Sequence, residues 1–263
     1  MQHSALLNVM IAAARKASRA LKRDFGEVEN LQVSLKGPGN FVTAADRRAE
    51  ETLRAELAKA RPGYGFLGEE GGHHAGTDVS HTWIVDPLDG TTNFLHGIPQ
   101  FAISIGLERS GAIVAGVIYN PISDELFVAE RGKGAFLNDR RLRVAARKLL
   151  ADSVIACGLP HLGRGDLELG LRELAAVQDK VAGLRRFGAA ALDMAFVAAG
   201  RLDGYWERNI SPWDIAAGLI LVREAGGFVT DLDGGDGMNT KRHIVAGNEP
   251  IHRELLKALK PAS

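Results

Sequence analysis

The chain has 263 residues, of which 46% are hydrophobic and 24% are charged. This is the composition of an ordinary globular protein, and it excludes a disordered, collagen-like or disulfide-scaffold chain. Basic and acidic residues number 32 each, so the formal net charge is zero. Proteins that bind nucleic acid or anionic membranes usually carry a basic excess, which this chain lacks. The composition therefore disfavours a nucleic-acid partner, although it does not exclude one.

The first residues and the cysteine content indicate where the protein acts. The apolar stretch from Ala5 to Ala14 precedes its positive charges, whereas a signal peptide carries its charges first. No apolar run approaches the roughly 20 residues that a membrane helix requires. The single cysteine, Cys157, excludes an internal disulfide and fits a reducing compartment. We therefore expect a cytoplasmic protein with no membrane partner.

Two helices followed by a largely antiparallel sheet are expected in the first half. Apolar residues from Leu7 to Phe25 recur in steps of three and four, which predicts a helix. A second helix is expected over residues 43–60, before Arg61-Pro62-Gly63. The β-rich segments are residues 83–85, 101–107, 112–119, 125–129 and 135–137.

Strands and helices alternate in the second half, which indicates α/β packing with covered sheet faces. Strands are expected at residues 153–157, 184–187, 204–206, 228–230 and 243–246. Helices are expected at residues 166–178, 190–199 and 213–225, and from Glu249 onward. The change of pattern divides the chain into residues 1–145 and 146–263, which we interpret as two halves of one compact unit.

The most informative segment runs from Trp83 to Asn93. A buried strand is expected to deliver Asp86 at its carboxyl end, and Asp89 follows three residues later. Two carboxylates on one tight turn supply oxygen ligands that suit Mg²⁺ rather than zinc. The backbone N–H groups of Gly90-Thr91-Thr92, where a short helix could begin, offer an anion site.

Three further acidic residues have competing interpretations. Glu69, in Gly68-Glu69-Glu70-Gly71-Gly72, is typical of a solvated turn. Asp46, in Thr43-Ala44-Ala45-Asp46, matches a capping box. Asp214, in Ser211-Pro212-Trp213-Asp214, matches a cap with proline at the first helical position. A capping carboxylate can also be a metal ligand, so the local pattern leaves both roles open.

Three blocks resemble the inositol monophosphatase family of Mg²⁺-dependent, lithium-sensitive phosphatases, and they occur in the family's order. The blocks are Gly68-Glu69-Glu70, residues 83–93, and Pro212-Trp213-Asp214-Ile215-Ala216-Ala217-Gly218 running on to Glu224-Ala225-Gly226-Gly227. The resemblance extends over nearly the whole chain. It implies an α/β (α+β) fold, a layered α-β-α-β-α sandwich of the sugar-phosphatase type.

The resemblance also implies a role for each site residue. The residues that resemble the ligands of two or three Mg²⁺ ions are Glu69, Asp86, Asp89, Asp214 and the carbonyl of Leu88. The residues expected to be catalytic are Thr91, which positions the attacking water, its partner Asp46, and Glu69 with Asp89. The expected substrate-binding residues are Gly90 and Thr91 for the phosphate, Glu207 for a ring hydroxyl, and Gly188, Ala189, Ala190 and Asp214 in the same pocket.

The implied reaction is in-line attack of a metal-activated water on a phosphate ester, with no phosphoenzyme. The expected substrate is inositol monophosphate or a similar small polyol phosphate. Histidinol phosphate, fructose 1,6-bisphosphate and a 3′-phosphonucleotide are alternatives within the same chemistry. A different class is a regulatory protein that acts through a partner such as RNA or the transcription machinery. Family precedent implies a homodimer.

Two positions depart from the family pattern. Ala189 stands where relatives often have serine or threonine, which leaves the ring specificity open. Arg208, next to Glu207, is bulkier and more basic than the residue in many relatives. Its guanidinium would either favour a second phosphate or carboxylate on the substrate, or lie in solvent on the rim of the site.

Overall fold

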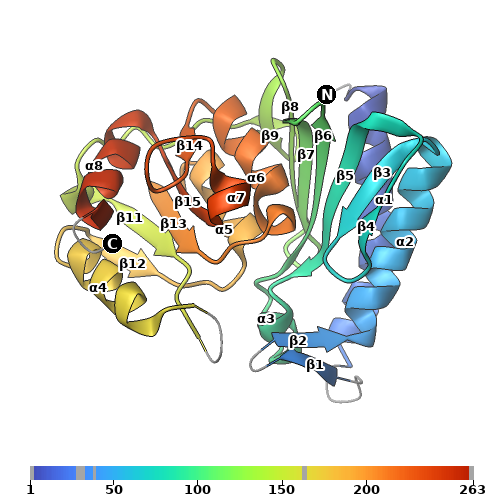
Figure 1. Ribbon diagram of the computed structural model, residues 1–263, viewed down its shortest axis with the longest axis horizontal. Helices are drawn as coiled ribbons and strands as arrows, with labels where there is room; N and C mark the ends of the chain where they lie inside the picture. Colours follow the sequence, from blue (N-terminus) through green and yellow to red (C-terminus); the bar gives the residue numbers. More distant parts are fainter. Residues whose placement is uncertain (1–2, 28–32, 38–39, 162–164, 261–263) are drawn as a thin grey trace.

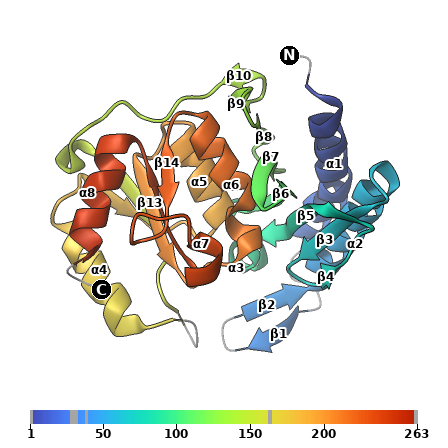
Figure 2. The same cartoon turned by 45° about the horizontal axis from the view of Figure 1, so that its top comes forward.

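The computed structural model describes residues 3–27, 33–37, 40–161 and 165–260. Its elements form five layers, in the order helices, sheet, helices, sheet, helices (Figure 1). Figure 2 shows the middle helical layer between the two sheets. The helical layers are α1 (Ala5–Phe25) with α2 (Ala44–Ala60), then α5 (Ala190–Ala198) with α6 (Pro212–Glu224), then α4 (Leu167–Gln178) with α8 (Glu249–Leu259).

The first sheet has eight strands in the order β10-β9-β8-β7-β6-β5-β3-β4. Its strands are antiparallel except for the parallel pair β3 and β5. They are β3 (Tyr64–Gly68), β4 (Gly72–His74), β5 (Asp78–Asp89), β6 (Ala102–Arg109), β7 (Ala112–Asn120), β8 (Glu125–Glu130), β9 (Gly134–Leu137) and β10 (Arg140–Arg141). A separate two-stranded sheet pairs β1 (Val33–Gly37) with β2 (Asn40–Thr43).

The second sheet has five strands in the order β12-β11-β13-β15-β14. The strands β12, β11 and β13 are parallel, and β15 runs antiparallel to both β13 and β14. They are β11 (Val154–Cys157), β12 (Gly183–Arg185), β13 (Gly204–Arg208), β14 (Phe228–Thr230) and β15 (His243–Gly247). The remaining short elements are α3 (Thr91–Leu95), the 3-10 helix at Leu150–Asp152 and α7 (Met238–Lys241).

Local sequence accounts for most of these elements. The predicted helices all form, and α1 begins where the Ser4 hydroxyl accepts a hydrogen bond from the Leu7 N–H at 3.1 Å. The apolar face of α1 is buried against the first sheet, which covers that side of the core. The largely antiparallel first sheet and the alternating second half are confirmed. No helix in the described ranges is long and apolar enough to cross a membrane.

The prediction for the strand before Asp86 is wrong in its extent. The strand was expected at residues 83–85, but β5 continues through Asp86 to Asp89, with a register shift against β6 between these two residues. Asp86 and Asp89 therefore lie on a strand that is paired with β6, and not on a free turn. The strand β3 and the pair β1 and β2 were not predicted. The run of glycine, aromatic and leucine residues in β3 lacks the alternation typical of a strand.

A close approach of α6 to the first sheet depends on two glycines. Gly106 on β6 and Gly116 on β7 lie directly opposite each other. A Cβ at Gly106 would lie 2.7 Å from the Cβ of Ala216, and a Cβ at Gly116 would lie 2.6 Å from Cγ2 of Ile220. Both contacts are shorter than van der Waals packing permits, so α6 lies at this depth only because neither strand residue has a side chain.

Gly116→Ala is therefore expected to lower the free energy of unfolding by about 1–3 kcal/mol, because the added methyl group overpacks the contact with α6. Urea denaturation checks the change. Gly26→Ala is the matched control, since Gly26 has a φ of −75° and its Cβ would meet its nearest neighbour at 3.5 Å. Equal stability of Gly116→Ala and the wild type would contradict the packing account.

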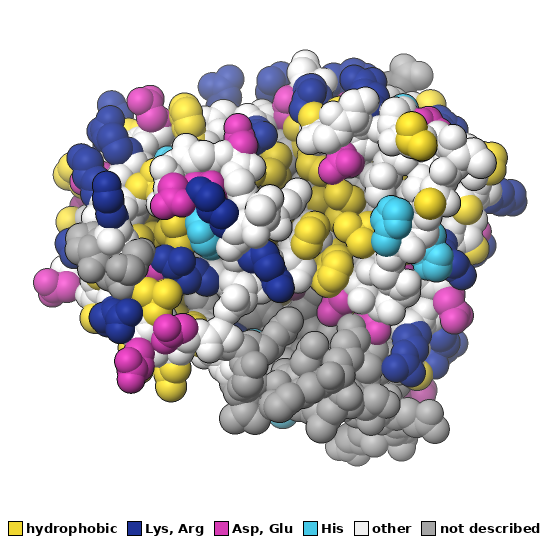
Figure 3. All heavy atoms as spheres, viewed as in Figure 1, with side chains coloured by type: hydrophobic (Ala, Val, Ile, Leu, Met, Phe, Trp, Pro, Cys, Tyr) yellow, Lys and Arg dark blue, Asp and Glu magenta, His cyan; other side chains and the backbone are white. Residues whose placement is uncertain are grey.

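Basic and acidic side chains are interspersed over one face of the molecule (Figure 3). This mixture agrees with the equal numbers of the two charge types in the sequence. A surface of mixed sign does not produce the extended positive field that steers nucleic acid. The charge on this face thus offers no support for electrostatic nucleic-acid binding.

Candidate active site

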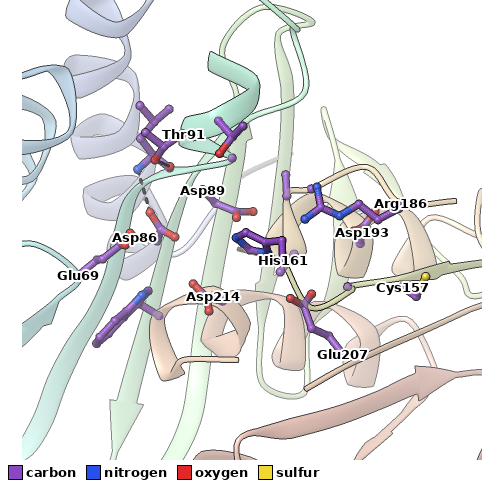
Figure 4. Close-up of a pocket in the computed structure, with 18 residues that line it drawn as sticks. Glu69, Asp86, Asp89, Thr91, Cys157, His161, Arg186, Asp193, Glu207 and Asp214 are labelled. Atoms are coloured by element: carbon purple, nitrogen blue, oxygen red, sulfur yellow. Dashed lines mark hydrogen bonds between the residues drawn. The ribbon is translucent and has the colours of Figure 1, made fainter. Parts of the chain in front are cut away.

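A cavity of about 330 Å³ lies where the end of β5, the start of α3, helices α5 and α6 and the strand β13 meet (Figure 4). Elements of both sheets and of the middle helical layer contribute to its wall. The predicted site residues that line it are Glu69, Asp86, Leu88, Asp89, Gly90, Thr91, Gly188, Ala189, Ala190, Glu207 and Asp214. Asp46, the remaining predicted residue, reaches the site through Thr91.

One backbone N–H group holds each of three carboxylates in the cavity wall. The Leu88 N–H donates to Oδ1 of Asp86 at 2.9 Å. The Ala191 N–H, in the first turn of α5, donates to Oδ2 of Asp89 at 2.8 Å. The Ser211 N–H donates to Oδ2 of Asp214 at 2.7 Å, so Asp214 takes part in capping α6 and lines the cavity as well. These bonds fix the carboxylates before any ligand arrives.

Burial and neighbouring carboxylates disfavour the ionised forms of Asp86 and Asp89. Burial raises the pKa of Asp86 well above its usual value, and the charges of Glu69, Asp89 and Asp214 raise it further. Burial likewise raises the pKa of Asp89 well above its usual value, with Asp214 the strongest repelling neighbour. The ionised cluster is therefore unfavourable by itself, and a bound cation would relieve both the burial and the repulsion.

The donor set at this end fits Mg²⁺. It consists of four carboxylates and the Leu88 carbonyl, and hard oxygen donors are the ligands that Mg²⁺ prefers. Among the described residues, no group of three or more histidine, cysteine, aspartate or glutamate side chains is arranged to hold a metal ion. Mg²⁺ does not require such a group, because it is usually held by one or two carboxylates together with water and phosphate oxygens. An open, oxygen-lined wall fits this ion better than it fits structural zinc.

Thr91 connects the cavity to helix α2. Its hydroxyl lies 3.0 Å from Oδ1 of Asp46 and 3.1 Å from the carbonyl oxygen of Leu88. Asp46 is buried in the first turn of α2. Its predicted capping box involves Thr43, whose side chain lies outside the described part of the chain. The Thr91 hydroxyl has one proton to donate to these two acceptors, so its lone pairs can accept a bond from a ligand.

Glu50 is a supporting residue that the sequence analysis missed. Its carboxylate accepts hydrogen bonds from the Glu70 N–H at 2.8 Å and the Gly71 N–H at 2.6 Å. A Cβ at Gly68 would lie 2.3 Å from Oε2 of Glu50, so the turn closes around this carboxylate because glycine is present. The turn that carries Glu69 is thereby fixed to α2. The sequence feature that could have identified Glu50 is its spacing of four residues from Asp46, which places both acids on one face of the helix.

Four more residues line the cavity and were also missed: Cys157, His161, Arg186 and Asp193. Cys157, Arg186 and Asp193 lie at the end opposite Glu69, and His161 lies between the two ends (Figure 4). Burial raises the pKa of the Cys157 thiol to about 12, so the thiol is neutral at physiological pH. Burial also raises the pKa of Asp193 well above its usual value, and Glu207 adds to this effect. One sequence feature could have identified Asp193, because it is the single acid in the otherwise apolar helix α5.

Glu207 occupies this end together with Tyr205, whose hydroxyl donates a hydrogen bond to Oε2 of Glu207. The neighbouring Arg208 does not line the cavity. Its Nε atom lies 2.6 Å from Oε1 of Glu173 on α4, and its side chain is only 23% exposed. Arg208 is therefore a partly exposed residue that pairs with Glu173 outside the cavity. Arg186 is the only arginine or lysine among the described residues that line the cavity.

The five-layer fold is that of the sugar-phosphatase type of α/β protein, and solved inositol monophosphatases have it. The sequence pattern of the Inositol monophosphatase family matches residues 2–262, and the chain belongs to this family. It is 67% identical to the Inositol-1-monophosphatase of Mesorhizobium japonicum, over 99% of this chain and 98% of that protein. It is 43% identical to the Nus factor SuhB of Pseudomonas aeruginosa, over 97% of this chain and 96% of that protein.

The fold also matches a solved structure closely. The extragenic suppressor protein suhB from Bartonella henselae superposes with a TM-score of 0.96 at 62% identity, covering 98% of this chain and 99% of that one. The predicted family and layered fold are thus confirmed, and the chain is a phosphatase of a family that is generally Mg²⁺-dependent. The roles of the individual site residues stay predictions.

The raised pKa of Asp86 has a consequence for stability. A carboxyl group whose pKa is higher in the folded than in the unfolded protein makes the free energy of unfolding fall as the pH rises above the usual value of 3.8. Asp86→Asn removes this charge, and the asparagine oxygen can still accept from the Leu88 N–H. In EDTA at pH 7.5, Asp86→Asn is expected to melt above the wild type, by about 2–4 °C for each kcal/mol gained.

Thermal unfolding at pH 7.5 and at pH 4 measures this effect. The advantage of Asp86→Asn should shrink at pH 4, where the wild-type carboxyl is protonated in the folded protein. Asp179→Asn, at the exposed end of α4, is the control. A melting temperature of Asp86→Asn below that of the wild type at pH 7.5, or a difference independent of pH, would contradict the account.

Proposed function

We propose that the protein is a Mg²⁺-dependent phosphomonoesterase that hydrolyses inositol monophosphate or a similarly small polyol phosphate. The observation that carries the proposal is one cavity that joins a cluster of carboxylates, the turn at Gly90-Thr91 and, at the far end, Glu207. The name of the Mesorhizobium japonicum relative, Inositol-1-monophosphatase, supports inositol 1-phosphate as the substrate.

The carboxylate end would hold the metal. Its donors are Glu69, Asp86, Asp89, Asp214 and the Leu88 carbonyl, and we propose two or three Mg²⁺ ions among them. When bound, Mg²⁺ would neutralise phosphate charge and increase the acidity of water in the site.

Protein groups around the metal end would orient the reactants. The Thr91 hydroxyl donates a hydrogen bond to Asp46 and would accept one from the attacking water. This second bond would orient the water so that one of its lone pairs points at phosphorus. The N–H groups of Gly90 and Thr91 would bind phosphate oxygens. Gly90 has a φ of 93°, and its Cβ would lie 2.8 Å from the Gln100 carbonyl oxygen, so this turn requires glycine. Glu69 and Asp89 would contribute to catalysis by holding the Mg²⁺ ions.

The opposite end would bind the polyol. Glu207 would accept a hydrogen bond from a ring hydroxyl, and Tyr205 fixes the orientation of its carboxylate. Gly188, Ala189 and Ala190 also line the cavity, and Asp214 would contact the substrate from α6. Ala189 contributes no hydroxyl, so ring recognition would depend on the charged residues of this end.

Phosphate release from a panel of esters tests the proposal. The panel contains inositol 1-phosphate, histidinol phosphate, fructose 1,6-bisphosphate and 3′-phosphoadenosine 5′-phosphate, each with and without Mg²⁺ and Li⁺. We expect preference for inositol 1-phosphate, dependence on Mg²⁺, inhibition by Li⁺, and a loss of at least about 10²-fold in Asp89→Asn, which removes a ligand charge.

The outcomes separate substrate from mechanism. Preference for another member of the panel, still lost in Asp89→Asn, would keep the chemistry and overturn the substrate. Absence of turnover on every ester by folded protein with Mg²⁺ present would overturn the proposed activity.

A second candidate is a regulatory protein that acts through RNA or the transcription machinery. The name of the Pseudomonas aeruginosa relative, Nus factor SuhB, supports it, at lower identity than the phosphatase relatives. The zero net charge and the mixed surface of Figure 3 weigh against electrostatic RNA binding. Asp89→Asn discriminates between the two, because a partner-binding function should survive in this variant.

We also propose a cytoplasmic homodimer in which residues 1–145 and 146–263 act as one catalytic unit. The resemblance to the family supports the dimer, and the single cysteine supports a reducing compartment. Asp86 from the first part and Asp214 from the second line the same cavity, which supports a shared catalytic unit.

A further inference from the structure

We propose that Asp193 is a specificity-determining residue whose carboxyl group hydrogen-bonds a hydroxyl of the bound polyol. The proposal rests on the proposed function and deepens it, because it assigns recognition of the alcohol part of the ester to a residue outside the three motif blocks. It makes no claim about the metal end of the cavity.

The first observation is an unused hydrogen-bonding atom. The side chain of Asp193 lines the cavity, and the residue is only 2% exposed. Its Oδ1 atom has no hydrogen-bond partner within the described residues. Buried carboxyl oxygens in folded proteins nearly always have a partner, and exceptions are often functional. The carboxyl group of Asp193 therefore has hydrogen-bonding capacity left for a ligand.

The second observation is the position of Asp193 on α5. The first turn of this helix is anchored to the metal end, because the Ala191 N–H donates to Asp89 at 2.8 Å. Asp193 lies two residues further along the helix, and Figure 4 shows it beside Arg186 at the far end of the cavity from Glu69. An ester whose phosphate lies beside Asp89 would extend its alcohol part along this wall toward Asp193.

The third observation is the chemistry of the neighbouring groups. Three charged groups lie close enough to act on Asp193. The carboxylates of Glu207 and Asp89 raise the pKa of Asp193, and the guanidinium of Arg186 lowers it. A hydroxyl group can donate to a carboxylate and accept from a guanidinium at the same time. Neighbouring hydroxyls on one ring match a wall that offers both kinds of partner. An ester with an apolar alcohol part would leave these groups unsatisfied.

A purely structural role for Asp193 makes a different prediction. If the carboxyl group only maintained the position of α5, its loss would disturb Asp89 and lower turnover of every phosphate ester alike. A contact with a substrate hydroxyl changes KM for polyol esters and leaves esters without hydroxyls unaffected. Inositol 1-phosphate and phenyl phosphate provide this comparison.

Steady-state kinetics of the full-length Asp193→Ala and Asp193→Asn variants with Mg²⁺ tests the proposal. We expect Asp193→Ala to raise KM for inositol 1-phosphate about tenfold with a smaller effect on kcat, the change for one lost hydrogen bond. Asp193→Asn keeps an amide that can bond the hydroxyl, so it should recover part of this loss. For phenyl phosphate, kcat/KM should stay within about twofold of the wild type. Asp179→Asn is the control, because it makes the same chemical change at a residue that does not line the cavity.

Equal losses on both esters would overturn the proposal in favour of a structural role, and so would an unchanged KM for inositol 1-phosphate in Asp193→Ala. If Asp193→Ala does not fold, Asp193→Asn alone decides, through the ratio of its effects on the two esters. Failure of the proposed function is seen separately, in the wild-type arm. Wild-type protein that cleaves phenyl phosphate but not inositol 1-phosphate would overturn the substrate assignment and, with it, the ligand assigned to Asp193.

Discussion

The repulsion among buried carboxylates is the constraint on which the rest of the site depends. Asp86 and Asp89 come from β5, and Asp214 comes from the first turn of α6. Burial and neighbouring negative charge both oppose the ionised forms of Asp86 and Asp89. The fold keeps them together through backbone N–H bonds and through the glycine pair that lets α6 pack closely on the sheet. Such a cluster is stable as an anionic site when a cation shares it.

The two ends of the cavity have separate chemistry, and one helix connects them. The start of α5 binds Asp89 through the Ala191 N–H, and the same helix places Asp193 at the end that contains Glu207 and Arg186. Placing both contacts on one helix would fix the phosphate position relative to the alcohol part of the ester. Such positioning contributes to rate because the reactants need not be reoriented in each encounter.

Much of this arrangement was predictable from the sequence, because it depends on local pattern. Apolar periodicity predicts α1, and the motif around Asp86 predicts two acids close together in the chain. The family resemblance, and not local pattern, adds Glu69 and Asp214 to this end. The extent of β5 was missed because pairing with β6, a contact between separate segments, overrides the turn-like proline and glycine. Glu50 and Asp193 were missed for a related reason. Their importance comes from partners brought together by folding, the Glu70-Gly71 turn and the far wall of the cavity.

Calorimetric titration with Mg²⁺ near pH 6.5, in two buffers of different ionisation enthalpy, tests the central claim most directly. Because burial and repulsion raise the pKa values of Asp86 and Asp89, we expect Mg²⁺ binding to displace protons from these two carboxyl groups. The account predicts binding to the wild type with proton release, and much weaker binding with less release in Asp89→Asn. Absence of binding, or binding without proton release that Asp89→Asn leaves unchanged, would contradict it.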